Sequence, residues 1–478
     1  MAKKHLVIIG HGMAGSRLLD ELQSRHAGTR YRITVYGEEP GAAYNRILLS
    51  KVLGGADPDT IRMKAETWHP GDDVTLVPRT RVDRIDSANR LLHLSDGSTE
   101  PYDIAIIATG SRPFIPKIEG SVLADSSPKP GVFAYRTLDD CLQMRSKLRP
   151  GDSAVVLGGG LLGLEAAKAL ADNGLHVTVC HLMPTLMETQ LDETGGKMLQ
   201  RQIEQQGIFV RCGRTIAAIL GCNQVRGVRL DDGTELAADM VVLACGIRPR
   251  VDLAQASGIP VNRGVIVNDA LATAVPGVYA LGECAEHRGR VYGIVTPIWE
   301  QCEALADILC ATGSARRYTG SKLYSRLKVA GVDVASMGVV KPELASDQTI
   351  QIFEEQRATY RKLILREGKL IGAQLVGDTA AAGQLVQLFD RNTTIPLNPL
   401  EALCAYSAAG GSTGAALDRQ VCNCNTVNES AIVSAIKQGC VSVEAVGVCT
   451  RAGTGCGSCR SQIVGLIREH RPAAAATL

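Results

Sequence analysis

The sequence is poor in aromatic residues and carries almost no net charge. Phe, Trp and Tyr make up 4% of the 478 residues, and 51 Lys and Arg balance 49 Asp and Glu, which leaves a net charge of +2. We therefore expect no nucleic-acid partner and no binding to an anionic membrane surface. Glycine is frequent instead, with 50 residues, and this favours tight turns and a close approach of the backbone to ligands.

Long apolar runs are also missing. Residues 6–9 are too few for the core of a signal peptide. The longest apolar stretch, residues 154–171, contains Glu165, Lys168 and four glycines, whereas a bilayer span needs about 20 residues with few or no charges. We therefore expect a cytoplasmic protein without a targeting segment.

A glycine-rich motif lies near the start of the chain, between a predicted strand and a predicted helix. Residues 10–15 follow a strand over 5–9 and open a helix over 13–23, and Glu38 comes after a second strand over 31–36. In such a motif the first glycine makes the turn, the second lets the backbone approach a pyrophosphate, and the third lets the helix pack on the strand. The motif predicts a dinucleotide site; a glycine turn without a ligand is the alternative.

The same arrangement occurs a second time. Residues 158–163 lie between a strand over 153–157 and a helix over 164–173, and another strand over 176–180 follows. Two such halves predict two dinucleotides and electron transfer between them, unless one copy is degenerate. The segment 179–183 contains neither a carboxylate for a ribose 2′-hydroxyl nor an Arg for a 2′-phosphate. NADH is favoured because no Arg or Lys closely follows the strand, and NADPH stays open.

Cysteines gather near the carboxyl end. Six of the 15 cysteines lie in the last 60 residues, and four of them have the spacing C-x-C…C-x2-C with 31 residues between the two pairs. Four thiolates bind either zinc or an iron–sulfur cluster, and the gap of one residue fits a zinc knuckle poorly. We expect the remaining two, Cys440 and Cys449, to pack in a core.

Residues 5 to about 310 resemble the glutathione-reductase superfamily of FAD/NAD(P) oxidoreductases, and within it the rubredoxin-reductase and apoptosis-inducing-factor branch. The two glycine motifs carry the resemblance, together with three strands, 102–107, 240–244 and 277–281, that each end in a glycine turn. The resemblance implies an α/β fold with two Rossmann-like domains, FAD at the first motif and NAD(P)H at the second. It places the following residues on these cofactors: Gly10, Gly12, Met13, Ala14, Gly15, Glu38, Arg46, Lys51, Val82, Ala108, Thr109, Gly110, Gly158, Gly160, Leu161, Leu162, Gly163, Glu165, Gly246, Gly282, Glu283 and Pro297.

Some of these residues have specific roles in the resemblance. Lys51 and Glu165 would form an ion pair beside the flavin N5 and act as the catalytic residues; an ordinary surface Lys and a helix-facing Glu are the alternative. Glu283 would bind the ribityl chain, where relatives usually have Asp. A helix capped by Thr296, with Pro297 at its first position, would point its positive end at the flavin pyrimidine, although a capped helix without a ligand has the same sequence.

Disulfide reductases of this superfamily carry one or two cysteines on the segment that corresponds to residues 41–51. This chain has none there. The absence excludes a thiol relay beside the flavin, and with it disulfide reduction and sulfenic-acid peroxidase chemistry at that place. Electrons must therefore leave the flavin by another route.

The C-terminal cysteines resemble the bacterioferritin-associated-ferredoxin type of [2Fe–2S] domain. The resemblance implies that Cys422, Cys424, Cys456 and Cys459 are the cluster ligands, with short helices over 428–438 and 459–470. Between the flavoprotein part and this module, residues 321–403 resemble the small α+β C-terminal domain of the superfamily. In relatives that domain forms the far wall of the flavin site or a homodimer contact.

These resemblances predict a domain order and a function. The domains are an FAD domain over 1–118 and 245–318, an NAD(P)H domain over 119–244, a small α+β domain over 319–404, a linker over 405–416, a helical [2Fe–2S] module over 417–470 and a disordered tail over 471–478. This order is similar to two families, the large subunits of NADH-dependent nitrite reductases and the electron-transfer subunits of assimilatory nitrate reductases. Because the chain ends at residue 478, we expect a diaphorase that passes electrons from NADH through FAD and the cluster to a separate molybdenum nitrate reductase. The alternatives are a separate sirohaem nitrite reductase or small redox protein as acceptor, and a docking or iron-sensing module outside the electron path.

Overall fold

The structure is a computed structural model that describes residues 2–63, 73–311, 316–395, 398–404, 418–422, 424–455, 457 and 459–471. The chain forms two compact units. The first consists of Met1–Phe114, Arg136–Leu138 and Ile247–Ser321, and the second of Ile115–Tyr135, Asp139–Gly246 and Lys322–Leu478. The predicted linker over 405–416 and residues 472–478 of the predicted tail lie outside the described residues.

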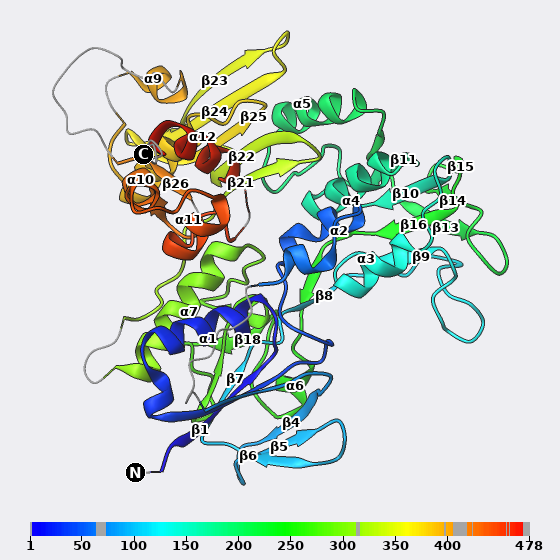
Figure 1. The fold of residues 1–478 in the computed structure, drawn as a ribbon. Coiled ribbons are helices and arrows are strands. Elements are labelled where there is room, and N and C mark those ends of the chain that lie inside the picture. The colour runs from blue at the N-terminus through cyan, green and yellow to red at the C-terminus, as the bar shows by residue number, and fades with distance from the viewer. Residues whose placement is uncertain are drawn as a thin grey trace, which may run out of the picture. The chain divides into compact units, whose positions relative to one another are not determined.

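The first unit is built on a five-stranded parallel sheet (Figure 1). Residues 5–9 are buried throughout, as expected for a parallel strand that is covered on both faces. Helices α1 (Met13–Ser24) and α7 (Val295–Cys310) pack against each other. The sheet order is β19 (Val278–Ala280), β7 (Ile104–Ile107), β1 (Lys4–Ile9), β2 (Tyr31–Tyr36) and β3 (Val74–Val77).

Smaller elements complete this unit. An antiparallel sheet consists of β4 (Val82–Asp86), β5 (Leu91–Leu94) and β6 (Thr99–Pro101), and α6 (Asp252–Ala256) packs on β4. The other elements are α2 (Leu49–Leu53), the antiparallel pair β8 (Ser111–Pro113) and β17 (Ile247–Pro249), and the parallel pair β18 (Val265–Val267) and β20 (Ala285–His287).

The second unit begins with another five-stranded parallel sheet. Its order is β12 (Phe209–Cys212), β11 (His176–His181), β10 (Ser153–Leu157), β16 (Met240–Leu243) and β9 (Val132–Ala134). Helix α4 (Leu161–Asp172) packs on β10 and β11, and α5 (Glu193–Glu204) packs on β12. The remaining elements are α3 (Leu138–Arg145) and an antiparallel sheet of β13 (Ile216–Leu220), β14 (Gly227–Leu230) and β15 (Glu235–Ala237).

An antiparallel sheet of five strands follows. Its order is β21 (Tyr324–Val329), β22 (Val332–Gly338), β25 (Lys369–Val376), β24 (Thr359–Arg366) and β23 (Gln348–Glu354). The amphipathic helix α8 (Ala382–Arg391) buries Leu385 and Val386 and packs on β25, and α9 (Pro399–Cys404) packs on β24. These elements form one apolar core, so the α+β character expected for this region is present.

The C-terminal cysteine module is small and mostly helical. The strands β26 (Gln420–Cys422) and β27 (Val427–Asn428) pair, and α10 (Glu429–Lys437), α11 (Val443–Thr450) and α12 (Arg460–His470) enclose a core that includes Ile432, Ile436 and Ile463. Asn428 is the N-cap residue of α10, but its side chain makes no capping hydrogen bond. In the described part of the chain no helix has the length and apolarity to cross a bilayer.

The observed fold is α/β, with two Rossmann-like halves, a small α+β region and a helical cysteine module. The second compact unit contains the second Rossmann-like half, the small α+β region and the cysteine module. The finer domain boundaries predicted within it therefore stay predictions.

Candidate functional site

Each glycine of the first motif has a separate structural reason. A Cβ atom on Gly10, whose φ is +122°, would lie 2.2 Å from the carbonyl oxygen of Ala108 at the end of β7. A Cβ on Gly15 would lie 2.0 Å from the Gly10 oxygen, but one on Gly12 would meet no atom within 4 Å. The first and third glycines therefore allow close packing, and the second leaves open space at the N-terminus of α1, where Met13 and Ala14 are the first helical residues.

The second motif repeats this geometry. A Cβ on Gly158 (φ +127°) would lie 2.2 Å from the Ala244 oxygen, one on Gly163 would lie 1.9 Å from the Gly158 oxygen, and one on Gly160 would meet nothing within 4 Å. Helix α4 starts directly after Gly160 with Leu161 and Leu162. Open space at a helix N-terminus with free N–H groups suits a phosphate, so both halves fit a dinucleotide.

Glu38, expected on the adenosine ribose, follows β2 and pairs with Arg250, whose Nη1 lies 2.5 Å from the Glu38 Oε2. The backbone oxygen of Arg250 accepts a hydrogen bond of 2.9 Å from the Thr109 hydroxyl, in the turn after β7 that also contains Ala108 and Gly110. These residues therefore converge at one edge of the first unit. Val82, also expected at the cofactor, begins β4 and is buried.

Glu283 lies in a polar cluster within the first unit. Its Oε2 accepts a hydrogen bond of 2.6 Å from the Ser111 hydroxyl and forms an ion pair with Arg136. The N–H of the preceding Gly282 donates to Oε1 of the buried Gln301 on α7, at 2.8 Å. The carboxylate is therefore fixed in place. We did not predict Ser111, Arg136 or Gln301, because no motif in the sequence marks them.

Arg46 extends this cluster. Its Nη1 donates to the backbone oxygen of Arg136 at 3.2 Å, and its Nη2 contacts the carboxylate of Glu39. The Tyr44 hydroxyl also donates to Glu39, at 2.6 Å. Burial raises the pKa of Tyr44, so the hydroxyl keeps its proton and remains a donor.

The expected catalytic pair is divided between the two units. Lys51 is an exposed residue of α2 in the first unit, and Glu165 belongs to α4 in the second. Within the second unit, Glu165 Oε1 accepts a hydrogen bond of 3.3 Å from the N–H of Ala330, in the turn between β21 and β22. The ion pair of Lys51 with Glu165 stays a prediction.

Gly246, also expected at the cofactor, is the last residue of the segment Asp139–Gly246 of the second unit. Its φ is +97°, and a Cβ on it would meet no atom within 4 Å.

The predicted cap of the helix that is expected to face the flavin is wrong. Helix α7 begins at Val295, its N-cap residue is Ile294, and no side chain caps it. Thr296 and Pro297 are therefore the second and third helical residues, and both are buried. Proline is still tolerated there, because N–H groups of the first turn have no partner within the helix.

Three of the four predicted cluster ligands lie close together. The Sγ atoms of Cys422 and Cys424 are 3.7 Å apart, both side chains are buried, and hydrogen bonds from the thiols of Cys424 and Cys459 lower the pKa of Cys422 to about 3. A thiolate is the form that binds metal. Cys456, the fourth predicted ligand, lies outside the described residues.

The surroundings of these cysteines also fit a cluster. The Asn425 side chain donates to the sulfur atoms of Cys422 and Cys424 at 3.9 and 3.8 Å. A Cβ on Gly455 would lie 2.4 Å from the Cys424 sulfur, so only glycine fits there. Among the described residues, no three Cys, His, Asp or Glu side chains are arranged around one ion. Asn425 and Gly455 were not predicted individually.

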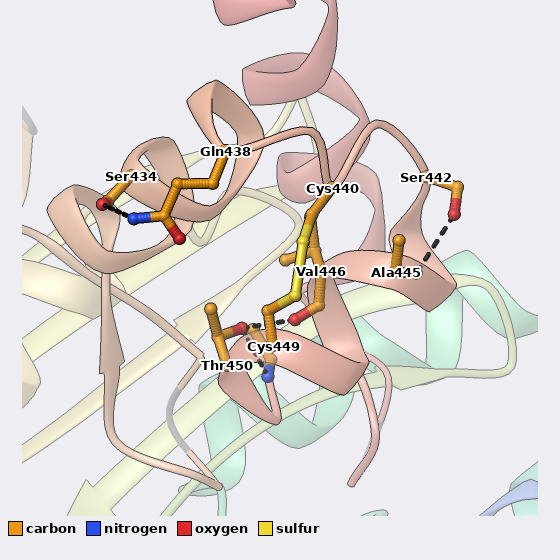
Figure 2. The surroundings of a disulfide bond; sticks show 9 residues. Ser434, Gln438, Cys440, Ser442, Ala445, Val446, Cys449 and Thr450 are labelled. Carbon is orange, nitrogen blue, oxygen red and sulfur yellow. Dashed lines mark hydrogen bonds between the residues drawn. A yellow bond between two sulfur atoms is a disulfide. The ribbon is translucent and has the colours of Figure 1, made fainter.

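Cys440 and Cys449 form a disulfide (Figure 2). The expectation that both pack in a core is confirmed for Cys440, which belongs to the core of the module, and is wrong for Cys449, which is exposed. Cys440 lies in the segment between α10 and α11, whereas Cys449 belongs to the last turn of α11. Ser442 caps α11 by accepting a hydrogen bond of 3.1 Å from the N–H of Ala445. The disulfide therefore links the segment after α10 to α11, which precedes the segment with the predicted ligands Cys456 and Cys459, here called the ligand loop.

The chain matches three family descriptions. Residues 4–303 match pyridine nucleotide-disulphide oxidoreductases, residues 324–393 the C-terminal domain of rubredoxin NAD+ reductase, and residues 420–469 the BFD-like [2Fe-2S] binding domain. The predicted resemblances to the FAD/NAD(P) oxidoreductase superfamily and to the bacterioferritin-associated-ferredoxin type of [2Fe–2S] domain are thereby confirmed.

Two curated relatives come from Bacillus subtilis (strain 168). A nitrite reductase (NAD(P)H) is 41% identical over 478 residues, which cover 98% of this chain and 58% of that protein. An assimilatory nitrate reductase electron transfer subunit is 36% identical over 472 residues, which cover 98% of this chain and 60% of that protein. The chain thus spans less than two thirds of either relative, and its length does not distinguish between them.

The solved structure of the covalent putidaredoxin reductase–putidaredoxin complex has the same fold, with a TM-score of 0.75 at 23% identity, over 85% of this chain and 100% of that chain. The chain therefore belongs to the pyridine nucleotide-disulphide oxidoreductase family, with sites for FAD and NAD(P)H and a BFD-like [2Fe–2S] domain.

Proposed function

We propose that the chain oxidises NADH and delivers the electrons, through FAD and the [2Fe–2S] cluster, to a separate molybdenum nitrate reductase. The observation that carries this proposal is the presence in one chain of two open glycine cradles and a module with buried, converging cysteines. When bound, FAD accepts two electrons as hydride and the cluster accepts them one at a time. The protein binds, orients and insulates these groups.

The residues of the first unit have assigned tasks in this proposal. The Ser111, Arg136 and Glu283 cluster would hold the polar chain of the flavin nucleotide, because Glu283 is already fixed and largely buried. The N-terminus of α7 would stabilise negative charge on the reduced ring. Lys51, held by Glu165, would favour hydride acceptance at N5.

The absence of a cysteine beside the expected flavin site limits the route by which electrons leave the flavin. Since residues 41–51 contain no cysteine, a thiol relay at that position is excluded, and the one-electron acceptor that the family match gives to this chain is the C-terminal [2Fe–2S] cluster. This favours an electron-path role for the module over a docking or sensing role.

Nitrite reduction is the second candidate for the terminal step. It is favoured by the 41% identity to a nitrite reductase, against 36% to the nitrate reductase subunit. In that case the acceptor is a sirohaem centre on another chain or in further residues of this protein.

The test uses the purified full chain with FAD and iron. NADH should bleach the flavin and produce an EPR signal from the reduced cluster. Cys424→Ser should abolish the signal and electron delivery, while flavin bleaching by NADH persists. Cys222→Ser, at an exposed free cysteine, is the matched control. If Cys424→Ser still reduced the partner at the full rate, the cluster would not be part of the electron path.

The acceptor is decided by reconstitution. Nitrate-dependent NADH oxidation with a molybdenum nitrate reductase, faster than nitrite-dependent oxidation with a sirohaem nitrite reductase, supports the first candidate. If nitrite-dependent NADH oxidation is the faster of the two, the acceptor is the sirohaem nitrite reductase and the second candidate is supported.

A further inference from the structure

An equivalent backbone hydrogen bond in each half allows the two glycine motifs to be aligned residue by residue. The N–H of Gly10 donates to the Tyr36 oxygen at 2.8 Å, and the N–H of Gly158 donates to the Cys180 oxygen at 2.8 Å. One residue further along each strand, Gly37 corresponds to His181. Two residues further, the acidic Glu38 corresponds to Leu182, whose side chain is exposed. The second half therefore lacks an acid at the position where the first half has one.

A carboxylate reaches the same edge from further along the chain. The N–H of Gly159 donates to His181 Nδ1 at 3.0 Å. Because Nδ1 accepts, the proton of a neutral imidazole is on Nε2, which lies 2.9 Å from Glu188 Oε2 and donates to it. The N–H of Met187 donates to the Gly159 oxygen at 3.1 Å, so the segment after β11 is tied to the glycine loop by both polar backbone groups of Gly159.

Glu188 is placed to receive a ligand. Its side chain is one-third exposed (33%), whereas that of His181 is 10% exposed. In the described part of the chain, Oε1 of Glu188 accepts no hydrogen bond from protein, since its contact to His181 uses Oε2. A carboxylate with one oxygen fixed and the other open suits a ribose hydroxyl, and its charge repels a phosphate.

A cation near this edge is already neutralised. The N–H of Arg214 donates to the His181 oxygen at 2.9 Å, which places Arg214 beside the end of β11. Its guanidinium Nε lies 2.7 Å from Asp232 Oδ2. An Arg at such a position would bind a ribose 2′-phosphate, but Asp232 occupies it.

We propose that Glu188, oriented by His181, selects NADH over NADPH at the second dinucleotide half, and that Asp232 supports this choice by holding Arg214. Glu188 is the specificity residue, and His181 and Asp232 are positioning residues. The inference rests on the proposed function, because it requires a nicotinamide dinucleotide at this half.

The experiment measures binding without turnover. ADP-ribose and 2′-phospho-ADP-ribose are titrated by calorimetry into the FAD-loaded full chain. The wild-type protein should prefer ADP-ribose. Glu188→Gln keeps the size of the side chain and removes its charge, so the preference should fall roughly tenfold. Asp232→Asn should also reduce the preference, by improving the binding of the 2′-phosphate.

Two further variants control the result. Glu193→Gln removes the same charge from an exposed residue of α5 that pairs with Lys197, and it should leave the preference unchanged. Adding Leu182→Glu to Glu188→Gln places an acid at the position of Glu38 in the first half and should restore the preference for ADP-ribose.

The outcomes separate the two proposals. If wild-type protein binds neither ligand, the assignment of this half to a nicotinamide dinucleotide fails, and with it the proposed function. If wild-type protein prefers ADP-ribose but Glu188→Gln keeps the full preference, as Glu193→Gln does, the role of Glu188 is wrong while the function stands. A preference lost in Glu188→Gln and regained with Leu182→Glu supports the inference.

Discussion

The two dinucleotide halves share a backbone but exchange their side chains at the ligand edge. In the first half, His11 is the middle residue of the glycine loop and Gly37 follows the strand; a Cβ on Gly37 would lie 3.0 Å from the Cβ of His11. In the second half, Gly159 is the loop residue and His181 the strand residue, and a Cβ on Gly159 would lie 2.7 Å from the His181 ring. Each half thus pairs one histidine with one glycine, but the histidine is in the glycine loop of the first half and after the strand in the second half.

This exchange shows which part of the motif is general and which is specific. The glycines that allow close packing are required in both halves for the same steric reason. In our proposal, the neighbouring residues differ in the polar group that they bring to the adenosine end of the nucleotide, Glu38 in one half and Glu188 in the other. Substitutions at the shared glycines therefore test the packing of both halves, and substitutions at the differing polar residues test nucleotide recognition in one half at a time.

The largest effects are expected at the third glycines. Gly15→Ala and Gly163→Ala place a Cβ at 2.0 and 1.9 Å from a backbone oxygen, so the helix must move away from its strand and the free energy of unfolding should fall by about 1–3 kcal/mol or more. Gly15→Ala should lose FAD, measured as the ratio of flavin to protein absorbance. Gly163→Ala should keep FAD but lose most flavin reduction by NADH.

The second glycines provide the control for this prediction. Gly12→Ala and Gly160→Ala meet no protein atom, so their thermal unfolding should match that of the wild type while nucleotide binding weakens. Unfolding of Gly160→Ala at a much lower temperature would show that this loop has a packing role that its open space does not reveal.

The next largest effect should be at Gly455 in the cluster module. Gly455→Ala would place a Cβ 2.4 Å from the Cys424 sulfur, so we expect loss of most bound iron, while NADH still reduces the flavin. Gly465→Ala, on α12 in open space, is the control and should retain iron. Iron and sulfide analysis decides the outcome, and a full iron content in Gly455→Ala would place the cluster elsewhere.

The sequence could predict the parts of the fold that depend on local pattern. The strands over 31–36 and 153–157 have the predicted bounds, and both glycine turns have the geometry that the motif requires. These features depend on apolar runs and on positions that only glycine can occupy. The family and its cofactors follow from the same residues together with the cysteine spacing.

Contacts between distant residues could not be predicted in this way. Arg136 reaches Glu283 across 147 residues, and Asn425 donates to the Arg451 oxygen across 26 residues. Neither pair has a characteristic spacing. The disulfide was missed for a related reason, since the interpretation of clustered cysteines as metal ligands gave no partner to Cys440 and Cys449. Thr296 has the residue type of a helix cap, but α7 begins two residues earlier than predicted, at Val295 with Ile294 as its N-cap residue.

A medium effect is expected at Glu283, which tests how the first half holds its nucleotide. Glu283→Gln keeps the hydrogen bond from Ser111 but removes the charge opposite Arg136. Loss of a largely buried charge partner should weaken FAD binding roughly tenfold to a hundredfold. Fluorescence titration of apoprotein with FAD measures this. Glu286→Gln is a poor control because Glu286 is buried and hydrogen-bonded to Gly264; the exposed Glu235→Gln, paired only with Arg229 on the surface, should leave FAD affinity unchanged.

A smaller effect should follow from removing the disulfide. It closes a short loop, with a sequence separation of 9 residues, and loop-closure entropy suggests a stabilisation of about 2–3 kcal/mol for the module. Cys449→Ser should therefore lower the temperature at which iron is released on heating, and dithiothreitol should lower it equally for the wild type. Cys222→Ser keeps the disulfide and should behave like the wild type both with and without dithiothreitol. An unaltered release temperature in Cys449→Ser would mean that the disulfide does not stabilise the ligand loop.

The smallest effect concerns Asp192, the N-cap residue of α5 in the second half. Its carboxylate accepts hydrogen bonds of 2.7 Å from the Lys362 ammonium and the Tyr360 hydroxyl, both on β24, and one of 2.9 Å from the N–H of Gly195. Burial alone would raise the pKa of Asp192, but these hydrogen bonds outweigh it and hold the pKa below the usual value.

A carboxyl group with a lowered pKa in the folded state stabilises the protein above its unfolded pKa of about 4, and the contribution is lost as the pH falls through the folded value. Asp192→Asn should therefore reduce the loss of unfolding free energy below pH 4 by an amount on the order of 1 kcal/mol, measured by thermal unfolding as a function of pH. Glu235→Gln, at an exposed surface site, is the control. The unfolding of the second half and of the small antiparallel domain should also separate in this variant. If both still unfold in one transition with the wild-type acid dependence, Asp192 does not couple them.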